Sequence, residues 1–460
     1  MNGEYPGNIF DLFKYYTELR VQENRTTFIE TINSQLIKNS FIKRGGVSAR
    51  VQKNGVYGFN SETKYDTRSI KKVIKNASEN AEFLSNCSKS NQIPANDKPL
   101  KIKKDYRTKK KKLSEKEKIE YLMYLNDFIK SEFPKVISYN LFLRDQEIEK
   151  HIFTSSRTEI IDVYTRSHIY CSLSLENDGV KYEIYDAFGN RGNFEDVFSS
   201  PLELSEKLYI QYEHLIKKGE GIYPKAGLKN VIIDSSISGI VAHEAIGHTV
   251  EADLVKSGSV GGDLLNKKIC SEKINITDFA NSYKDELLPV PVFIDDEGSE
   301  AQDVHLIENG ILKNFMHNQK TAFEFNTSAL GNARGFYFNS EPLIRMRNTA
   351  ILPGEDSLEE MINSIEDGYY LMKTSNGEAD STSEFMFGII QGYEIKNGKL
   401  GCGLKDFTVS GIAFDLLKTV SMTSDKICWD NSGYCGKKQP MIVSYGAPAI
   451  KCKMNIGGKL

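Results

Sequence analysis

The sequence predicts an α+β fold, because two kinds of local pattern occur along its 460 residues. Strand-like runs flank several Asn-Gly dipeptides, and other segments carry apolar residues at helical spacing. At about 150 residues per domain, a chain of this length corresponds to two or three domains. We expect an N-terminal α+β domain over residues 1–225, with a mixed sheet and helices. A C-terminal domain over residues 226–460, richer in strands, should follow it.

Hairpins are predicted where Asn-Gly separates two strand-like runs, because this dipeptide suits two-residue type I′ turns. Residues 47–51 and 56–59 flank the first such turn, and residues 304–307 and 311–315 flank the second. The third follows residues 392–395. The dipeptides are Asn54-Gly55, Asn309-Gly310 and Asn397-Gly398. Residues 181–185 also form a strand-like run.

Helices are predicted from apolar periodicity and from capping residues at their starts. Apolar residues repeat at i, i+3, i+4 and i+7 between residues 70 and 84, behind Asp66 or Thr67 as a cap. Ser114 with Glu117 and Ser357 with Glu360 have the spacing of capping boxes. We therefore expect helices to begin at these three places.

Residues 86–112 have the weakest pattern and include a run of basic side chains. We interpret this stretch as a solvated linker or loop, not as a site for nucleic acid. The whole chain has 59 Lys and Arg against 62 Asp and Glu, a net charge of −3. Such a balance gives no electrostatic reason to bind nucleic acid.

Three features of the composition suggest where the protein works. No run of about 18 apolar residues is present, so we expect no membrane span. The first residues lack a charged leader followed by an apolar core, so we expect no signal peptide. The seven cysteines are odd in number and widely spaced, which is not a disulfide framework. Together these features favour a cytoplasmic protein.

The most informative segment contains His243, Glu244 and His248 on one predicted helix. Zinc hydrolases usually place two histidines four residues apart, with a glutamate after the first as general base. Here the spacing is five, which on a regular α-helix turns the rings about 140° apart. A one-residue π-bulge would bring them back to one side, and Gly247 would tolerate such a distortion. Two ordinary histidines on a helix remain the alternative.

Two carboxylates after the second histidine are further candidates. Glu251 and Asp253 follow His248 within about one turn, where some zinc sites take a carboxylate ligand. The simpler interpretation is a solvated helix end. Arg345 is a candidate for binding a peptide carboxylate or an oxyanion, with a salt bridge at the protein surface as the simpler alternative.

Several segments resemble the TldD/PmbA metallopeptidase family, in the family's order and over most of the chain from about residue 40. HEAIGHTVEAD (243–253) is similar to the family's His-Glu-x-x-x-His motif and the tail that follows it. The remaining segments are GGVSARVQKNGVYGFN (45–60), FIDDEGSEAQDVHLIENGILKNFMHN (293–318), GNARG (331–335), RMRN (345–348), LPG (352–354) and GYCGKKQPMIVSYGAPAI (433–450).

The resemblance implies a zinc site. It implies His243, His248 and Cys435 as the metal ligands and Glu244 as the general base. Cys428, seven residues before Cys435, is the alternative third ligand. Because the His-Glu-x-x-x-His motif is intact, the chain resembles the catalytic TldD type.

The resemblance also implies a function and a partner. We expect a zinc-dependent peptidase that hydrolyses unfolded peptides, removing leader segments of ribosomally made modified peptides or degrading such peptides. It should form a heterodimer with a TldE/PmbA-like paralogue that lacks the metal motif, or a homodimer. The alternative is a non-catalytic, zinc-stabilised binding or modulator protein of a peptide toxin or DNA gyrase pathway. Glu244 favours hydrolysis, because a purely structural zinc site has no use for this glutamate.

Overall fold

The computed structural model describes residues 8–87, 92–94, 99–379 and 382–459. The N-terminal half forms one mixed sheet in the order β3-β2-β1-β5-β6-β4, and β7 pairs with the other part of β6. All neighbours are antiparallel except β4 and β6. The strands are β1 (Tyr16–Ile32), β2 (Gln35–Lys53), β3 (Val56–Glu62), β4 (Lys101–Asp105), β5 (Val136–Thr154), β6 (Glu159–Asn177) and β7 (Val180–Arg191).

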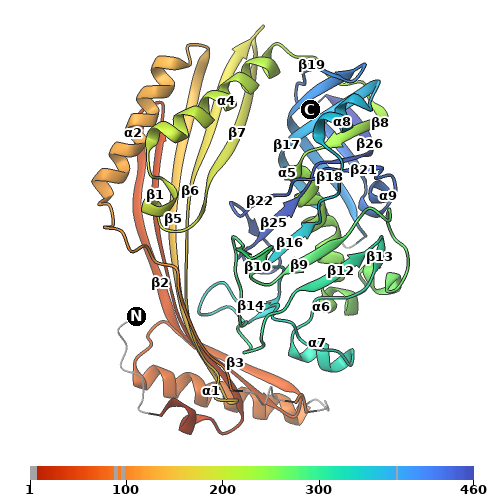
Figure 1. The fold of residues 1–460 in the computed structure, drawn as a ribbon. Coiled ribbons are helices and arrows are strands. Elements are labelled where there is room, and N and C mark those ends of the chain that lie inside the picture. Colours follow the sequence, from red (N-terminus) through yellow and green to blue (C-terminus); the bar gives the residue numbers. More distant parts are fainter. Residues whose placement is uncertain (1–7, 88–91, 95–98, 380–381, 460) are drawn as a thin grey trace.

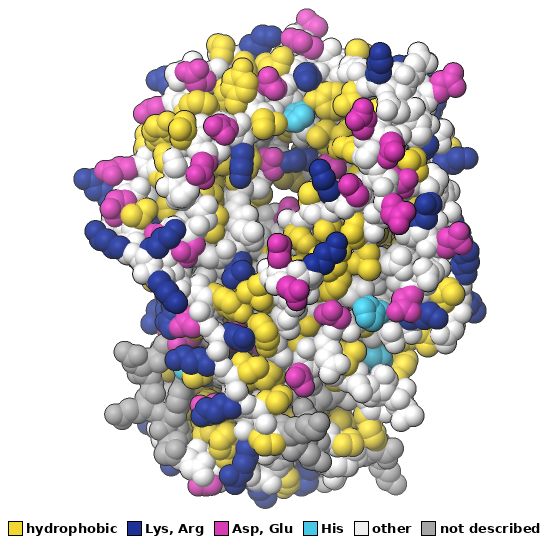
Figure 2. Space-filling model, viewed as in Figure 1, with side chains coloured by type: hydrophobic (Ala, Val, Ile, Leu, Met, Phe, Trp, Pro, Cys, Tyr) yellow, Lys and Arg dark blue, Asp and Glu magenta, His cyan; other side chains and the backbone are white. Residues whose placement is uncertain are grey.

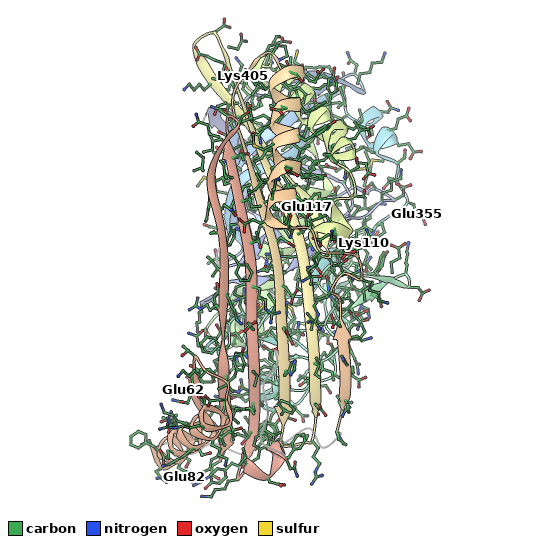
Figure 3. All side chains as sticks on the ribbon, turned by 90° about the vertical axis from the view of Figure 1, so that its left-hand side faces the viewer. Glu62, Glu82, Lys110, Glu117, Glu355 and Lys405 are labelled. Carbon is green, nitrogen blue, oxygen red and sulfur yellow. The ribbon has the colours of Figure 1, made fainter. Side chains whose placement is uncertain are left out.

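Helices cover this first sheet at its two ends (Figure 1). At one end α1 packs on β2 and β3 around a core that includes Leu19, Val21 and Ile70. At the other end α2 and α4 pack around a second core that includes Leu125, Leu141 and Leu208. Figure 3 shows α2 lying along the upper part of the sheet, with Glu117 near its start. The helices are α1 (Thr67–Cys87), α2 (Glu115–Glu132), α3 (Phe194–Val197) and α4 (Pro201–Gly219).

The C-terminal half contains two larger sheets. One has the strand order β17-β8-β26-β20-β18-β19 and is closed, because β17 also pairs with β18. Its strands are β8 (Gly227–Ile233), β17 (Asp367–Ala379), β18 (Glu384–Lys396), β19 (Lys399–Gly403), β20 (Phe407–Ile412) and β26 (Ile450–Lys459). The other has the order β13-β12-β9-β16-β25-β22. Its strands are β9 (Ile276–Phe279), β12 (Val304–Glu308), β13 (Ile311–Leu312), β16 (Asn348–Ile351), β22 (Cys428–Asp430) and β25 (Ser444–Ala447).

Short elements complete this half. The described short helices are α5 (Ser235–Ile240), α6 (Ala252–Lys256), α7 (Gln319–Glu324), α8 (Leu358–Asn363) and α9 (Ala413–Lys418). The described short strands are β10 (Ser282–Tyr283), β11 (Glu286–Leu287), β14 (Ala333–Arg334), β15 (Leu343–Ile344), β21 (Met422–Thr423), β23 (Tyr434–Cys435) and β24 (Met441–Ile442). Helix α5 contacts strands of both larger sheets, so the segment that follows α5 begins inside the core.

The predicted α+β class is confirmed, and so are its local signals. Each Asn-Gly dipeptide joins two antiparallel strands, and residues 181–185 lie within β7. Asp66 accepts a hydrogen bond from the Ser69 amide at the start of α1. Both predicted capping boxes are formed, by Ser114 with Glu117 and by Ser357 with Glu360. Both halves are rich in strands, and the longest described strands, β2, β5 and β6, belong to the first half.

The interpretation of residues 86–112 as a linker or loop is wrong in part. Residues 86 and 87 end α1, and Lys101–Asp105 form strand β4 at the sheet edge. The apolar pattern of the sequence does not predict this strand, because four of its five residues are charged, which an edge strand tolerates. Residues 88–91 and 95–98 of this stretch lie outside the described residues. The domain boundary between residues 225 and 226 stays a prediction.

The two halves meet through buried charges of the Asp295-Asp296-Glu297 segment. Arg20 of β1 and Lys150 of β5 bind Asp296 at 2.5 and 2.9 Å, and Arg50 of β2 binds Glu297. Breaking such a pair leaves an uncompensated buried charge, so the segment fixes the first sheet against the C-terminal half.

Two features of the structure concern the expectations about nucleic acid and membranes, namely the charges on its surface and the composition of its helices. Acidic and basic side chains are interspersed on the face that Figure 2 shows. None of the described helices combines the length and the apolar composition needed to cross a bilayer.

Candidate metal centre

The segment with both histidines leaves regular α-helical geometry, as the five-residue spacing predicts. Helix α5 continues into a π-helix over Val241–Gly247, and His248–Val250 form a short 3₁₀ turn. Because a π-turn closes between residues five apart, it brings His243 and His248 to one side of the helix. Their ring centroids are 5.3 Å apart. The predicted widening of the turn is confirmed.

Gly247 has a different role from the one expected. Its φ of −55° is an ordinary helical value that any residue adopts. A Cβ at this position would lie 2.0 Å from the Sδ atom of Met346. Met346 is itself buried, so the helix needs glycine here to pack closely against the segment before β16.

Cys435 approaches the two histidines from a hairpin distant in sequence. It lies on β23, which pairs with β24, and its Sγ atom is 3.1 Å from Nε2 of His248. One ligand atom from each of His243, His248 and Cys435 fits within 4.8 Å of the others. Cys428 is exposed on β22 and does not belong to this group.

The donor set suits a zinc ion. Neither ring nitrogen of His243 has a hydrogen-bond partner in the described part of the chain, although the side chain is buried. Burial raises the pKa of the Cys435 thiol, but the neighbouring imidazoles of His243 and His248 lower it to about 5. Two imidazoles and a thiolate are common zinc ligands, and three protein ligands leave a fourth position open.

Glu251 supports His248 and lies outside the group of ligand atoms. Its Oε2 atom is 2.9 Å from Nδ1 of His248 and 3.1 Å from Nζ of Lys437. Burial favours the neutral acid, yet His248 and Lys437 hold the pKa of Glu251 below its usual value. A carboxylate in this position fixes the ring orientation of a ligating histidine. The solvated helix end expected here is therefore wrong for Glu251, which is fully buried.

Asp253 also binds Lys437, at 2.8 Å, and is not part of the ligand group. Lys437 follows Cys435 by two residues. Cys435 thus contacts His248 through its thiol, and Lys437 contacts the segment that follows His248.

Glu244 reaches toward both histidines without being buried. Its carboxylate oxygens lie 3.8 Å from Nε2 of His243 and 3.6 Å from Nε2 of His248. Its side chain is 35% exposed, against 3% for His243. The carboxylate therefore lies beside the ligand group and is accessible to water, as a general base requires.

Family profiles match three parts of the chain. Residues 226–458 match the PmbA/TldA metallopeptidase C-terminal domain, residues 17–81 match domain 1, and residues 109–211 match the central domain. The chain belongs to the TldD/PmbA family. The family expected from the sequence motifs is therefore confirmed.

Relatives of this family member carry protease names. A "zinc metalloprotease TldD homolog" of Saccharolobus solfataricus is 31% identical over 97% of this chain and 100% of its own length. A "metalloprotease" of Archaeoglobus fulgidus is 30% identical over 96% of this chain and 99% of its own.

Two solved structures share the fold of this TldD/PmbA chain. TldE from Thermococcus kodakarensis has a TM-score of 0.75 at 18% identity and covers 98% of both chains. A putative modulator of a DNA gyrase from Thermotoga maritima also has a TM-score of 0.75, at 19% identity, covering 95% of this chain and 96% of its own.

Two fully buried arginines bind carbonyl groups of residues 431–439, the segment that carries Cys435. Arg345 donates from Nη2 to the carbonyl of Cys435 at 2.7 Å, and from Nη1 to the carbonyls of Lys437 and Gln439. It is therefore neither a substrate-binding group nor part of a surface salt bridge. Arg166 of β6 donates from Nη1 to the carbonyls of Asn431 and Gly433, at 2.6 and 3.2 Å.

Other side chains of the first sheet join Arg166 on this loop. His168 bonds Asn431 at 3.0 Å, and the Tyr170 hydroxyl donates to the carbonyl of Ser432 at 2.6 Å. Burial lowers the pKa of His168 to about 3, so its ring is neutral. The hydroxyl of Tyr434 donates to Gln146 of β5 at 2.9 Å. The N-terminal half thus positions residues 431–434, which directly precede the candidate metal ligand Cys435.

Sequence reasoning missed Arg166, His168 and Tyr170. Their alternation along β6 places them on one face of the strand. The two-residue spacing is visible in the sequence, but it does not indicate which segment contacts that face of β6.

The first prediction concerns the ligands. Full-length protein should bind about one zinc per chain, and Cys435→Ser or His243→Ala should remove most of it, because each deletes one of three donors. Cys428→Ser is the matched control and should keep its zinc. Elemental analysis after dialysis measures the content. Full zinc in Cys435→Ser, with loss in Cys428→Ser, would transfer the third ligand to Cys428.

The second prediction concerns the loop. Arg166→Lys keeps the charge but not the geometry that reaches two carbonyls, so zinc affinity should fall by about 10- to 100-fold. Arg191→Lys, on the neighbouring strand β7, is the matched control. Competition with a chelator measures affinity, and the thiolate-to-metal absorption band of the cobalt-substituted protein reports the Cys435 contact. Unchanged affinity and absorption in Arg166→Lys would show that this arginine does not position the ligand.

Proposed function

We propose that this protein is a zinc-dependent peptidase, with His243, His248 and Cys435 as ligands and Glu244 as general base. The observation that carries the proposal is the placement of an accessible carboxylate beside three donors, of which His243 and Cys435 are buried and His248 is half-buried. The protease names of relatives that align over nearly their whole length support the same class. Zinc, when bound, would supply Lewis-acid chemistry that polarises a peptide carbonyl and makes water more acidic.

The residues of the chain would perform the proton transfers. The Glu244 carboxylate would accept a proton from the attacking water and deliver it to the amine that leaves when the peptide C–N bond breaks. Glu251 would keep the His248 ring in one orientation through its contact with Nδ1. Lys437, bound to Glu251 and Asp253, would compensate the buried negative charge behind that ring.

The substrates we propose are unfolded peptides, such as leader segments of ribosomally made modified peptides. Figure 2 shows a hollow between the first sheet and the C-terminal half. The described contacts between Tyr185 and the carbonyl of Thr374 and between Tyr170 and the carbonyl of Ser432 join the two halves. An extended chain would enter a hollow of this kind more readily than a folded domain would.

We further propose that the enzyme works as a dimer, either with a TldE-like paralogue or with a second copy. The solved relative of this fold named TldE supports such a pairing. The alternative function, a non-catalytic modulator, rests on the name of another solved relative at 19% identity. Glu244 disfavours the alternative, because a zinc ion that only stabilises the fold needs no accessible carboxylate beside it.

The third prediction separates the enzyme from the modulator. Glu244→Gln keeps size and hydrogen bonding but accepts no proton, so cleavage of an unstructured peptide should fall by about 10²–10⁴-fold. Zinc content should not change, because Glu244 is not proposed as a ligand. Turnover of an unstructured peptide pool by the zinc-loaded protein, with any paralogue included, measures the effect.

Glu359→Gln, an exposed change on α8, is the matched control for the loss of one carboxylate. Equal cleavage by Glu244→Gln and the unmutated protein would exclude Glu244 as the base. Failure of both to cleave any peptide in the pool would favour the modulator function.

A further inference from the structure

A second pocket lies between the first sheet and the C-terminal half, outside the group of candidate metal ligands. Its cavity volume is about 70 Å³, enough for several water molecules. Its floor is the face of β4, β6 and β5. Its other walls come from residues 290–296, from Phe336, and from Met441 and Ile442 of β24.

Strand register places the floor side chains in rows. Ile102, Ile160 and Ile152 are partners on three adjacent strands and form an apolar row. Lys104, Asp162 and Lys150 form the next row in the same order. Since residues two apart on a strand share a face, both rows line one pocket. The pocket therefore combines an apolar floor with a short charged strip.

Most charges around the pocket are already paired. Lys150 binds both carboxylate oxygens of Asp296, at 2.9 Å each. Arg334 donates to the carbonyls of Met346 and Ile442. Asp295 accepts hydrogen bonds from the amides of Glu297, Ser299 and Ala333. None of these groups needs a ligand to satisfy it.

Asp162 and Lys104 differ from the other charged groups. Neither side chain makes a hydrogen bond or an ion pair with another described residue, although the two are register partners. The ammonium of Lys104 lies 3.9 Å from the ring centroid of Phe293. Burial raises the pKa of Asp162 to about 6, and Lys150 opposes that rise. The pocket thus presents the carboxyl group of Asp162 and the amino group of Lys104, each without an ion-pair partner among the described residues, beside an apolar surface.

We propose that this pocket binds a free α-amino acid with an apolar side chain. Its ammonium would meet Asp162, its carboxylate would meet Lys104, and its side chain would pack on the isoleucines and Phe336. An α-amino acid carries its ammonium and its carboxylate on the same carbon atom. It therefore matches Asp162 and Lys104, which lie side by side on neighbouring strands. Charge-assisted hydrogen bonds of this kind are about twice as strong as neutral ones.

The pocket adjoins the candidate metal centre through one hairpin. Met441 and Ile442, which line the pocket, pair with Cys435 and Tyr434. Free amino acids are end products of peptide degradation. An amino acid released by such degradation and bound in this pocket would therefore contact the hairpin that carries Cys435. Binding itself does not depend on the proposed peptidase activity.

The test is isothermal titration calorimetry of the full-length, zinc-loaded protein with four probes. L-leucine should bind. L-leucinamide lacks the carboxylate, N-acetyl-L-leucine lacks the ammonium, and glycine lacks the apolar side chain. Each should bind at least about tenfold more weakly, because each leaves a charged group unpaired or the floor uncovered. These comparisons need no mutation, so they do not depend on how a variant folds.

Two near-isosteric variants locate the site. Asp162→Asn and Lys104→Gln should each weaken L-leucine binding by about tenfold or more, with zinc content unchanged. Lys103→Gln, an exposed neighbour on β4, is the matched control and should bind normally. Absence of L-leucine binding would overturn the proposal. Equal binding of L-leucinamide, or binding that survives both variants, would also overturn it, because the amino acid would then lie elsewhere, for example at the zinc.

Discussion

The π-helical turn between His243 and His248 is the local feature on which the candidate metal centre depends. A regular α-helix would direct these rings apart, whereas the π-turn brings the ring centroids within 5.3 Å. The turn is held by burial on several sides. Gly247 admits Met346 at a distance no side chain would allow, and Gly239 similarly admits Tyr445. The irregular helix is therefore stabilised by close packing against β25 and the segment before β16.

The third candidate ligand couples this helix to the rest of the chain. Cys435 reaches the histidines from the β23–β24 hairpin, where Arg345 binds the carbonyl of Cys435 itself and Arg166 binds carbonyls of the residues just before it. Arg166 belongs to the first sheet, and that sheet is fixed by buried ion pairs to the Asp295-Asp296-Glu297 segment. All three candidate ligands thus lie in the C-terminal half, and the first sheet holds the segment that leads into one of them.

Local features were predictable from the sequence, and contacts between distant segments were not. The turn at Asn54-Gly55 and the capping box of Ser114 with Glu117 depend on a few adjacent residues. The five-residue histidine spacing also predicted the widened turn, because a π-turn aligns residues five apart. By contrast, β4 pairs with a strand more than fifty residues later. Nothing local indicated that Glu251 would be buried against His248, or that β6 would hold the Cys435 loop.

X-ray absorption at the zinc K-edge of the zinc-loaded protein would identify the atoms bound to the metal and so test whether His243, His248 and Cys435 are its ligands. With His243, His248 and Cys435 as ligands, the spectrum should show one sulfur at about 2.3 Å and two imidazole nitrogens at about 2.0–2.1 Å, with the remaining position taken by a light atom. The sulfur contribution should disappear in Cys435→Ser. A spectrum without sulfur, or with two sulfurs, would contradict the ligand set of His243, His248 and Cys435.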